Sequence, residues 1–402
     1  MRLLFVSHSL PPDGRPLANV GGMQRVALKL HESLEKKAAC ADAFEYDGLH
    51  LRSAWRTLHA KVPFFLAKTA WQIGRAARTD AVDVVLFSSM VTASLAVPLQ
   101  GLLRRHGVRT AAIVHGLDVT MPFSPYQWFV PKVFDALDAV LPVSRATQQA
   151  CLDRGAPSAL LRVVPNGIDI DRFHLPKDRP TDRRTLEQSV GAPAPPPPPE
   201  GLLLCSVGRQ VKRKGTAWFV DAVMPRLPDD VHYWIAGDGP QSATIQNAID
   251  RHDLSPRVRY LGRVSNETLA HLYRGADLFI MPNVPVEDDM EGFGIVLLEA
   301  GQCGTPAIAA RLEGIQDVLT EGVNGHLVAP EDPNAFVEAI EQYRGNPEVL
   351  ETASERARKH TEATFGWPAV ADTYLSVLRS LDTEGHPQPE AADPPAEALL
   401  SP

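Results

Sequence analysis

The chain has 402 residues, of which 44% are hydrophobic and 22% are charged, and its formal net charge is −8. This length allows about two to three domains, and the composition is ordinary for a soluble globular protein. The negative net charge excludes an overall basic field of the kind that holds nucleic acid.

The cysteines and the N-terminal residues favour a cytoplasmic protein. The four cysteines are far apart and include no C-x-x-C pair, which argues against a zinc site or a disulfide framework. The opening residues M-R-L-L-F-V-S-H become polar too soon for a signal peptide. Residues 84–103 carry no charge, but their Ser, Thr, Pro and Gln residues favour a strand, a turn and a helix over a membrane span.

The first half of the chain alternates short apolar runs with amphipathic stretches. After a Pro- and Gly-rich loop over residues 9–22, a helix starting near Met23 has Val26, Leu30 and Leu34 on one face. Such alternation predicts a parallel doubly wound sheet, which binds ligands at the C-terminal ends of its strands. The predicted strands are 3–7, 82–87, 110–114, 139–142 and 161–164, and the later helices are 93–105, 126–136 and 145–154.

The composition changes over residues 176–200, where charged residues are followed by A-P-A-P-P-P-P-P-E. A proline run joins neither a sheet nor a helix, so we interpret 176–200 as a proline-rich linker; a docking segment for a proline-binding domain is the alternative. The alternation then resumes. The expected strands are 202–207, 232–236, 258–261, 278–281 and 307–309, and the expected helices are 217–226, 241–251, 267–274, 295–303, 334–343, 347–363 and 367–381.

These patterns predict an α/β protein with two Rossmann-like, doubly wound domains that face each other across a cleft. The first domain covers residues 1–175, with 366–381 packing back on it, and the second covers 201–365. The acidic tail 382–402 is rich in Pro and Ala and is expected to be disordered.

Residues 291–306, E-G-F-G-I-V-L-L-E-A-G-Q-C-G-T-P, predict a Gly-rich loop that leads into a short buried helix. Gly292 and Gly294 let a ligand approach the backbone, and the start of a helix attracts anions, phosphates above all. Glu299 lies one turn inside, and its side chain would tilt back to the same pocket. A buried carboxylate needs a partner. An Arg or a backbone N–H would serve, and so would a ribose; the second acid, Glu291, favours the ligand.

Two cations follow the first strand of the second domain. Gly208 and Arg209 end that strand, and Lys214 comes five residues later before a helix, which suits a diphosphate. We interpret Arg213 as part of a solvated surface turn. Gly237 lies in a tight turn that could run alongside a nucleotide base, although the need for a tight turn alone explains the glycine. Arg263 is a weaker candidate for a residue that lines the base pocket.

The first domain offers a histidine at the end of a strand. His115 would face the cleft, although a satisfied core histidine is a common alternative. Asp118 either orients His115 or caps the next turn. Gly21 and Gly22 precede the first helix, where they allow either an anion or sugar contact or a flexible helix entry.

Several other site types are excluded or disfavoured. The chain contains no G-x-G-x-x-G after its first strand and no P-loop motif, which excludes the usual dinucleotide-binding site and the usual P-loop nucleotide site. The acidic run Glu287, Asp288 and Asp289 could bind Mg²⁺ weakly, but we interpret it as a solvated loop.

Taken in order, these motifs resemble those of a family-4 retaining glycosyltransferase of the GT-B fold, or glycosyltransferase group 1, over about residues 1–380. The resemblance is carried by G-G-M at 21–23, H-G-L-D at 115–118, V-S at 143–144, P-N-G-I-D at 165–169, G-R at 208–209, K-G at 214–215, G-D-G-P at 237–240 and the Glu-x7-Glu pair Glu291 and Glu299.

The resemblance implies an acceptor-binding first domain, a nucleotide-sugar-binding second domain and a C-terminal helix that crosses back. Arg209 and Lys214 would hold the donor diphosphate with help from the backbone at Gly294 and Ile295, and Glu299 would bind ribose. The remaining implied donor contacts are Glu291, Gly292 and Phe293 to the transferred sugar, His115 across the cleft, and Gly21 and Gly22 near the diphosphate or sugar.

The family resemblance further implies a co-substrate, a UDP- or GDP-linked sugar, and no metal or cofactor. The acceptor would be a sugar or a lipid-linked hydroxyl, in polysaccharide, lipopolysaccharide or glycolipid synthesis. Gln316 in E-G-I-Q-D and the long acidic loop 282–290 depart from the family pattern and put the identity of the donor sugar in doubt.

Alternative functions are a nucleotide-sugar epimerase of the same architecture and a non-catalytic nucleotide-sugar-binding protein. Residues 58–78 form a predicted basic amphipathic stretch, in which apolar residues such as Phe64 and Trp71 alternate with Lys61 and Lys68. Such a basic amphipathic face either contacts the inner face of a membrane peripherally or packs on the first sheet.

Overall fold

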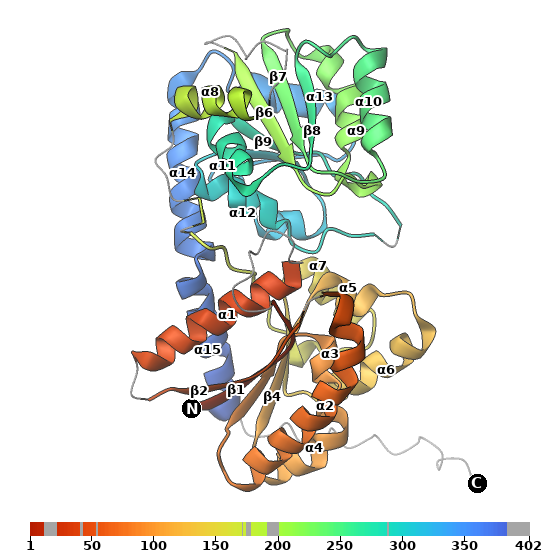
Figure 1. The fold of residues 1–402 in the computed structure, drawn as a ribbon, viewed down its shortest axis with the longest axis vertical. Helices are drawn as coiled ribbons and strands as arrows, with labels where there is room; N and C mark the ends of the chain where they lie inside the picture. The colour runs from red at the N-terminus through yellow and green to blue at the C-terminus, as the bar shows by residue number, and fades with distance from the viewer. Residues whose placement is uncertain are drawn as a thin grey trace, which may run out of the picture.

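In the computed structural model, the chain forms two α/β domains, with helices α14 and α15 running along one side of both (Figure 1). The structure describes residues 1–11, 22–40, 43–53, 55–170, 172–173, 178–190, 201–287 and 289–383. Both sheets are parallel throughout, and helices cover them, as the alternating pattern predicts.

The first domain contains a five-stranded sheet in the order β2-β1-β3-β4-β5. The strands Val84–Phe87 and Ala139–Pro142 are buried at every residue, which explains why their sequences are continuous apolar runs without alternation. The strands are β1 (Arg2–Leu10), β2 (Glu45–Arg52), β3 (Val84–Phe87), β4 (Arg109–Val114) and β5 (Ala139–Pro142). The helices are α1 (Gly22–Ala39), α2 (Trp55–Arg78), α3 (Met90–Ala93), α4 (Ala96–Arg105), α5 (Gly116–Thr120), α6 (Ser124–Asp135) and α7 (Arg145–Leu152).

The second domain contains a six-stranded sheet in the order β11-β10-β9-β6-β7-β8. The strands are β6 (Leu202–Val207), β7 (Val231–Ala236), β8 (Val258–Gly262), β9 (Leu278–Met281), β10 (Ala307–Ala310) and β11 (Gly325–Val328). The helices are α9 (Thr216–Ala222), α10 (Ser242–Arg251), α11 (Asn266–Gly275), α12 (Ile295–Gln302) and α13 (Pro333–Glu341), with short 3-10 helices η3 (Lys212–Lys214) and η5 (Glu313–Asp317).

The chain crosses between the domains twice, and the two crossings are hydrogen-bonded to each other. The Ile168 amide donates to the Phe365 carbonyl at 2.7 Å, and the Trp367 amide donates to the Ile168 carbonyl at 3.3 Å. The second crossing joins α14 (Pro347–Phe365) to α15 (Trp367–Thr383), and α15 contacts α1 of the first domain. The crossings thus form one paired connection on one side of the molecule.

A further contact joins the domains across α7. The Arg145 backbone amide donates to Asp317 Oδ2 at 2.7 Å, and the Arg145 side chain also bonds the Asp317 carboxylate. A carboxylate at the start of a helix is favourable because the amides there carry partial positive charge. The E-G-I-Q-D segment therefore contacts the first domain directly.

Some predicted elements differ from the structure. Residues 161–164 form a single bridge, from Val140 to Leu161, instead of a strand. The edge strands β2 and β11 were not predicted, because E-Y-D-G-L-H-L-R and G-H-L-V carry polar residues and rely on pairing with β1 and β10.

The predicted linker 176–200 is partly helical, since its charged portion forms α8 (Arg179–Val190). This helix packs on α11, where Asp182 accepts hydrogen bonds from Arg274, and Arg183 bonds Asp277. The proline run at 191–200 and most of the predicted tail, residues 384–402, lie outside the described residues. Within the described part of the chain, no helix is long and apolar enough to cross a membrane.

Candidate active site between the two domains

A cavity of about 320 Å³ lies between the domains. Residues that follow strands β4, β5 and β6 meet there, so it lies at the C-terminal edges of both sheets, where doubly wound folds bind ligands. The first domain contributes Met23, Val26, His115, Gly116 and Val143, with Asn166 from the crossing segment, and the second contributes Gly208, Arg209, Lys214 and residues 291–296.

The Gly-rich loop of the second domain leads into α12, as its sequence predicts. Gly294 precedes α12 with φ of 78°, a left-handed conformation that side chains other than glycine rarely adopt. The cavity is lined by Gly292, Phe293, Gly294 and Ile295, so the first amides of α12 lie at its wall. Free amides at this position attract anionic groups.

Lys214 and Glu291, both predicted site residues, form a direct ion pair. Lys214 Nζ lies 2.5 Å from Glu291 Oε2, and Asn283 Nδ2 donates to the same oxygen at 3.4 Å. Burial disfavours ionisation of Glu291, but the cations of Lys214 and Arg213 outweigh it and hold the pKa of Glu291 below its usual value. Burial is the largest influence on Lys214 and lowers its pKa despite Glu291.

Arg213 is a correction to the sequence analysis, which interpreted it as a solvated turn residue. Its Nη1 donates to Glu291 Oε2, and its Nε donates to Asp289 Oδ1 at 2.8 Å. Asp289 is thus ion-paired although its side chain is 44% exposed, Glu287 is exposed as expected, and Asp288 lies outside the described residues. The turn η3 folds against the 282–291 segment because Gly215 touches Pro282, where an added Cβ would lie 1.8 Å from the carbonyl oxygen. A run of three basic residues carries no local signal of such a contact.

Arg209 lines the cavity, and its side chain is exposed. It forms no ion pair with any residue that the structure describes, so its charge is available to a ligand. Gly237 lies beside the same strand end, and a Cβ there would lie 1.9 Å from the Gly208 carbonyl oxygen. Gly237 and Arg263 do not line the cavity; the Arg263 side chain is 83% exposed and pairs with Asp238 at 3.4 Å.

Glu299 is buried and has protein partners. Tyr273 donates to its Oε2 at 2.9 Å, and Arg25 Nη1 donates to its Oε1 at 3.3 Å. Arg172 bonds the same Oε1. An Arg partner, one of the alternatives that the sequence left open for the Glu299 carboxylate, is thus present. Glu299 itself is not among the cavity-lining residues. The sequence analysis did not single out Arg25 or Arg172, although each follows a motif, at 21–23 and at 165–169, by a few residues.

His115 ends β4 and lines the cavity, with 8% of its surface exposed. Burial lowers the pKa of its imidazole to about 4, so the ring is neutral at neutral pH. Asp118 Oδ2 accepts the His115 backbone amide at 3.3 Å, and burial raises the pKa of Asp118 to about 7. Of the two roles left open, Asp118 caps the turn that carries His115.

Asn166 and the glycines before α1 belong to two further motifs of the first domain. Asn166 of the P-N-G-I-D motif lines the cavity, and its buried Oδ1 has no hydrogen-bond partner among the described residues. The sequence predicted its motif, P-N-G-I-D, but did not predict Asn166 as a site residue. Gly22 begins α1, and Gly21 lies outside the described residues.

Known proteins resemble both halves of the chain. The family model described as Glycosyltransferase Family 4 matches residues 20–172, and that described as Glycosyl transferases group 1 matches residues 201–346. A D-inositol 3-phosphate glycosyltransferase of Catenulispora acidiphila is 32% identical over 266 residues, which cover 62% of this chain and 58% of that relative.

A second relative matches over more of its length. It is the GDP-mannose-dependent alpha-(1-6)-phosphatidylinositol monomannoside mannosyltransferase of Mycolicibacterium smegmatis, 27% identical over 86% of this chain and 90% of the relative. The crystal structure of Anabaena HepE in complex with UDP and glucose aligns with a TM-score of 0.66 at 19% identity, covering 94% of this chain and all of that one.

Proposed function

The chain belongs to the family-4 glycosyltransferases of the GT-B fold, and we propose that it is a retaining, metal-independent enzyme that moves a hexosyl group from a nucleotide diphosphate sugar to a hydroxyl acceptor. UDP- and GDP-linked sugars are the donors proposed. The glycosyltransferases among its relatives support this class of reaction.

One observation carries the proposal: the cavity has exposed cationic Arg209 and the start of α12 on one side and His115 on the other. Fixed cations and helix amides would neutralise the charge that develops on a departing diphosphate, without a metal ion. The neutral imidazole of His115 would face the transferred sugar as a hydrogen-bonding group. Closure of the domains would exclude water that hydrolyses the donor.

Glu291 and Lys214 would change partners when the donor binds. We propose that Lys214 turns from Glu291 toward the diphosphate, and that Glu291, still held by Arg213, accepts hydrogen bonds from sugar hydroxyls. The acceptor hydroxyl would attack from the face that the nucleotide leaves, and its proton would pass to the departing phosphate. This course retains the configuration at the anomeric carbon.

We propose a sugar or lipid-linked acceptor in the synthesis of polysaccharide, lipopolysaccharide or glycolipid, and peripheral contact of a cytoplasmic protein with the inner membrane face. Helix α2 supports the membrane contact. Ile73 and Ala77 are buried against the sheet, whereas Phe64 is 86% and Trp71 63% exposed on the outer face. Lys61, Lys68 and Arg75 are exposed at positions that share this face by helical spacing.

A thermal-shift screen of nucleotide sugars, followed by product analysis with and without acceptors, tests the function. A retained anomeric configuration in the product and activity that survives a metal chelator are expected. Epimerised donor formed without an acceptor would favour the epimerase, and tight binding without any turnover would favour a binding protein. For the membrane contact, co-sedimentation with anionic vesicles should weaken in a variant with Lys61→Glu and Lys68→Glu.

A further inference from the structure

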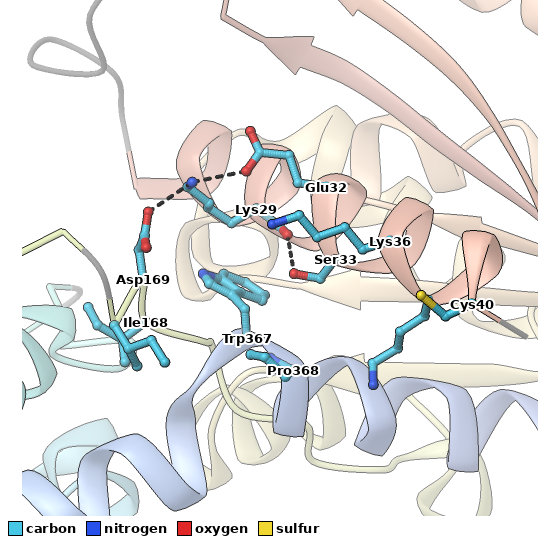
Figure 2. Close-up of a pocket in the computed structure, with 11 residues that line it drawn as sticks. Lys29, Glu32, Ser33, Lys36, Cys40, Ile168, Asp169, Trp367 and Pro368 are labelled. Carbon is cyan, nitrogen blue, oxygen red and sulfur yellow. Dashed lines mark hydrogen bonds and ion pairs between the residues drawn. The ribbon is translucent and has the colours of Figure 1, made fainter.

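A second cavity, of about 310 Å³, lies on the connection between the domains and away from the candidate active site. One wall is helix α1, and the other is formed by the two crossings, through Ile168, Ile170, Trp367 and Pro368 (Figure 2). Its volume is within the range of small-molecule sites. A molecule bound there would touch the first domain and both crossings at once.

The floor of this hinge cavity is apolar and carries one unused donor. Trp367 is 6% exposed and lies between Lys29 and Pro368 in Figure 2. Its indole N–H has no acceptor within the described part of the chain and is not among the fully enclosed polar atoms, so it is open to the cavity. A buried indole normally finds a partner for its N–H, so the cavity offers a hydrogen bond to an incoming acceptor atom.

The rim of the hinge cavity carries three ammonium groups, and two of them are paired with a total of three carboxylates. Lys29 is shared between Glu32, at 2.9 Å, and Asp169, at 2.8 Å, and Lys37 pairs with Asp372 at 2.6 Å. Lys36 is exposed and has no ion-pair partner among the residues described. An apolar floor, an unpaired indole N–H and the unpaired ammonium of Lys36 together match a molecule with a flat apolar body and one anionic group.

We propose that the hinge cavity binds a small amphipathic anion and thereby stabilises the arrangement of the two crossings. The anionic group lies against Lys36 and the Trp367 N–H, and the apolar body lies on Ile168, Ile170 and Pro368. Because the walls belong to α1 and to both crossings, the ligand opposes any motion that moves them apart. The binding itself does not depend on the donor chemistry proposed above.

Anilinonaphthalene sulfonate, an aromatic anion that fluoresces in apolar sites, is a direct probe. We expect saturable binding to the full chain, weakened about fivefold or more by Lys36→Glu, as suits reversal of a charge at a partly exposed contact. Lys359→Glu, at an exposed position on α14 outside the cavity, is the matched control and should leave the affinity unchanged. Equal affinities for the wild type and Lys36→Glu, or equal losses in the two variants, would overturn the proposal.

Cys40 provides a second test that leaves the charged residues of the cavity unchanged. Its thiol is exposed at the rim of the hinge cavity, whereas Cys151, Cys205 and Cys303 are buried. Alkylation of the native fold with N-phenylmaleimide should block binding of the probe in the wild type, but not in Cys40→Ser treated in the same way. Undiminished binding after complete alkylation would contradict the assignment. Failure of UDP to bind would refute only the proposed donor chemistry.

Discussion

Arg25 of helix α1 donates a hydrogen bond of 3.3 Å to Glu299 of helix α12, although the two residues belong to different domains. With Arg172 and Tyr273, this carboxylate has three donors. An ionised carboxylate has about four lone-pair positions, so one remains for a ribose hydroxyl. The proposed bond from a ribose hydroxyl is therefore compatible with the contacts by which Glu299 joins the domains.

Replacement of Glu299 by glutamine keeps the shape of the side chain but removes its charge. Arg25 and Arg172 then lose their charged partner, and we expect the free energy of unfolding to fall by about 1–3 kcal/mol, with weaker binding of UDP. Urea denaturation and calorimetry measure the two effects. Glu355→Gln, in an exposed pair with Lys359, is the control and should cost little. Equal costs in both variants would contradict this assignment.

Arg209→Ala should reduce transfer without reducing stability, because the side chain is exposed and has no ion-pair partner among the described residues. We expect a loss of about 2–4 kcal/mol in transition-state stabilisation, as for other lost charge-stabilising donors. Steady-state kinetics measure the loss as kcat/KM. Lys212→Ala, three residues along and also exposed, is the control. Unchanged kcat/KM in Arg209→Ala would show that this cation does not meet the diphosphate.

Arg213→Ala should lower kcat more than it weakens UDP binding, because Arg213 contacts Glu291 and Asp289 and does not line the cavity. Arg213→Lys should recover only part of kcat, since a single ammonium cannot reproduce the two contacts of a guanidinium. Separate measurement of kcat and of the dissociation constant for UDP distinguishes the effects. A loss confined to UDP binding would instead make Arg213 a phosphate ligand.

The fold was largely predictable, because buried parallel strands and amphipathic helices leave strong local patterns. The candidate site was predictable where motifs follow strand ends, as with His115, Arg209 and the loop before α12. The residues that pair with the site carboxylates Glu291 and Glu299 were not predictable, because Arg213 and Arg25 look like ordinary surface cations in the sequence. Their roles depend on contacts with residues 78 and 274 positions away, which no local pattern encodes.

Gly237→Ala tests the close approach of two strand ends. A Cβ would overlap the Gly208 carbonyl, and φ is 121°, so the backbone must shift. We expect a loss of about 2 kcal/mol or more in the free energy of unfolding, since strain and overlap both oppose the change. Gly101→Ala in α4 meets no atom within 4 Å and should stabilise the protein by about 0.5–1 kcal/mol. Similar effects at both positions would contradict this explanation.

Asp118→Asn tests the raised pKa of the buried carboxyl. In the fold, Asp118 keeps its proton up to about pH 7, whereas its ordinary pKa is 3.8. Unfolding therefore releases a proton between these values, and the free energy of unfolding of the wild type falls as pH rises through this window. Relative to Asp118→Asn, the fall should total on the order of 4 kcal/mol.

Urea denaturation of both proteins at several pH values between 4 and 8 measures this difference. Burial lowers the pKa of His115, and its imidazole has a backbone hydrogen bond at Ser88; Asp118→Asn removes neither, so the loss of stability that this lowered pKa causes at acidic pH cancels in the comparison. Parallel curves for the two proteins would show that Asp118 is ionised in the fold at neutral pH.

Two of the ion contacts that join the domains differ in their sensitivity to ionic strength. Both carboxylates are largely buried, but the Arg145 side chain is 69% exposed where it meets Asp317, whereas the Arg25 side chain is 25% exposed where it meets Glu299. At about 0.15 M salt the Debye length is about 8 Å, and added salt screens exposed pairs before buried ones. We therefore expect rising salt to weaken the contact at α7 before the contact between α1 and α12.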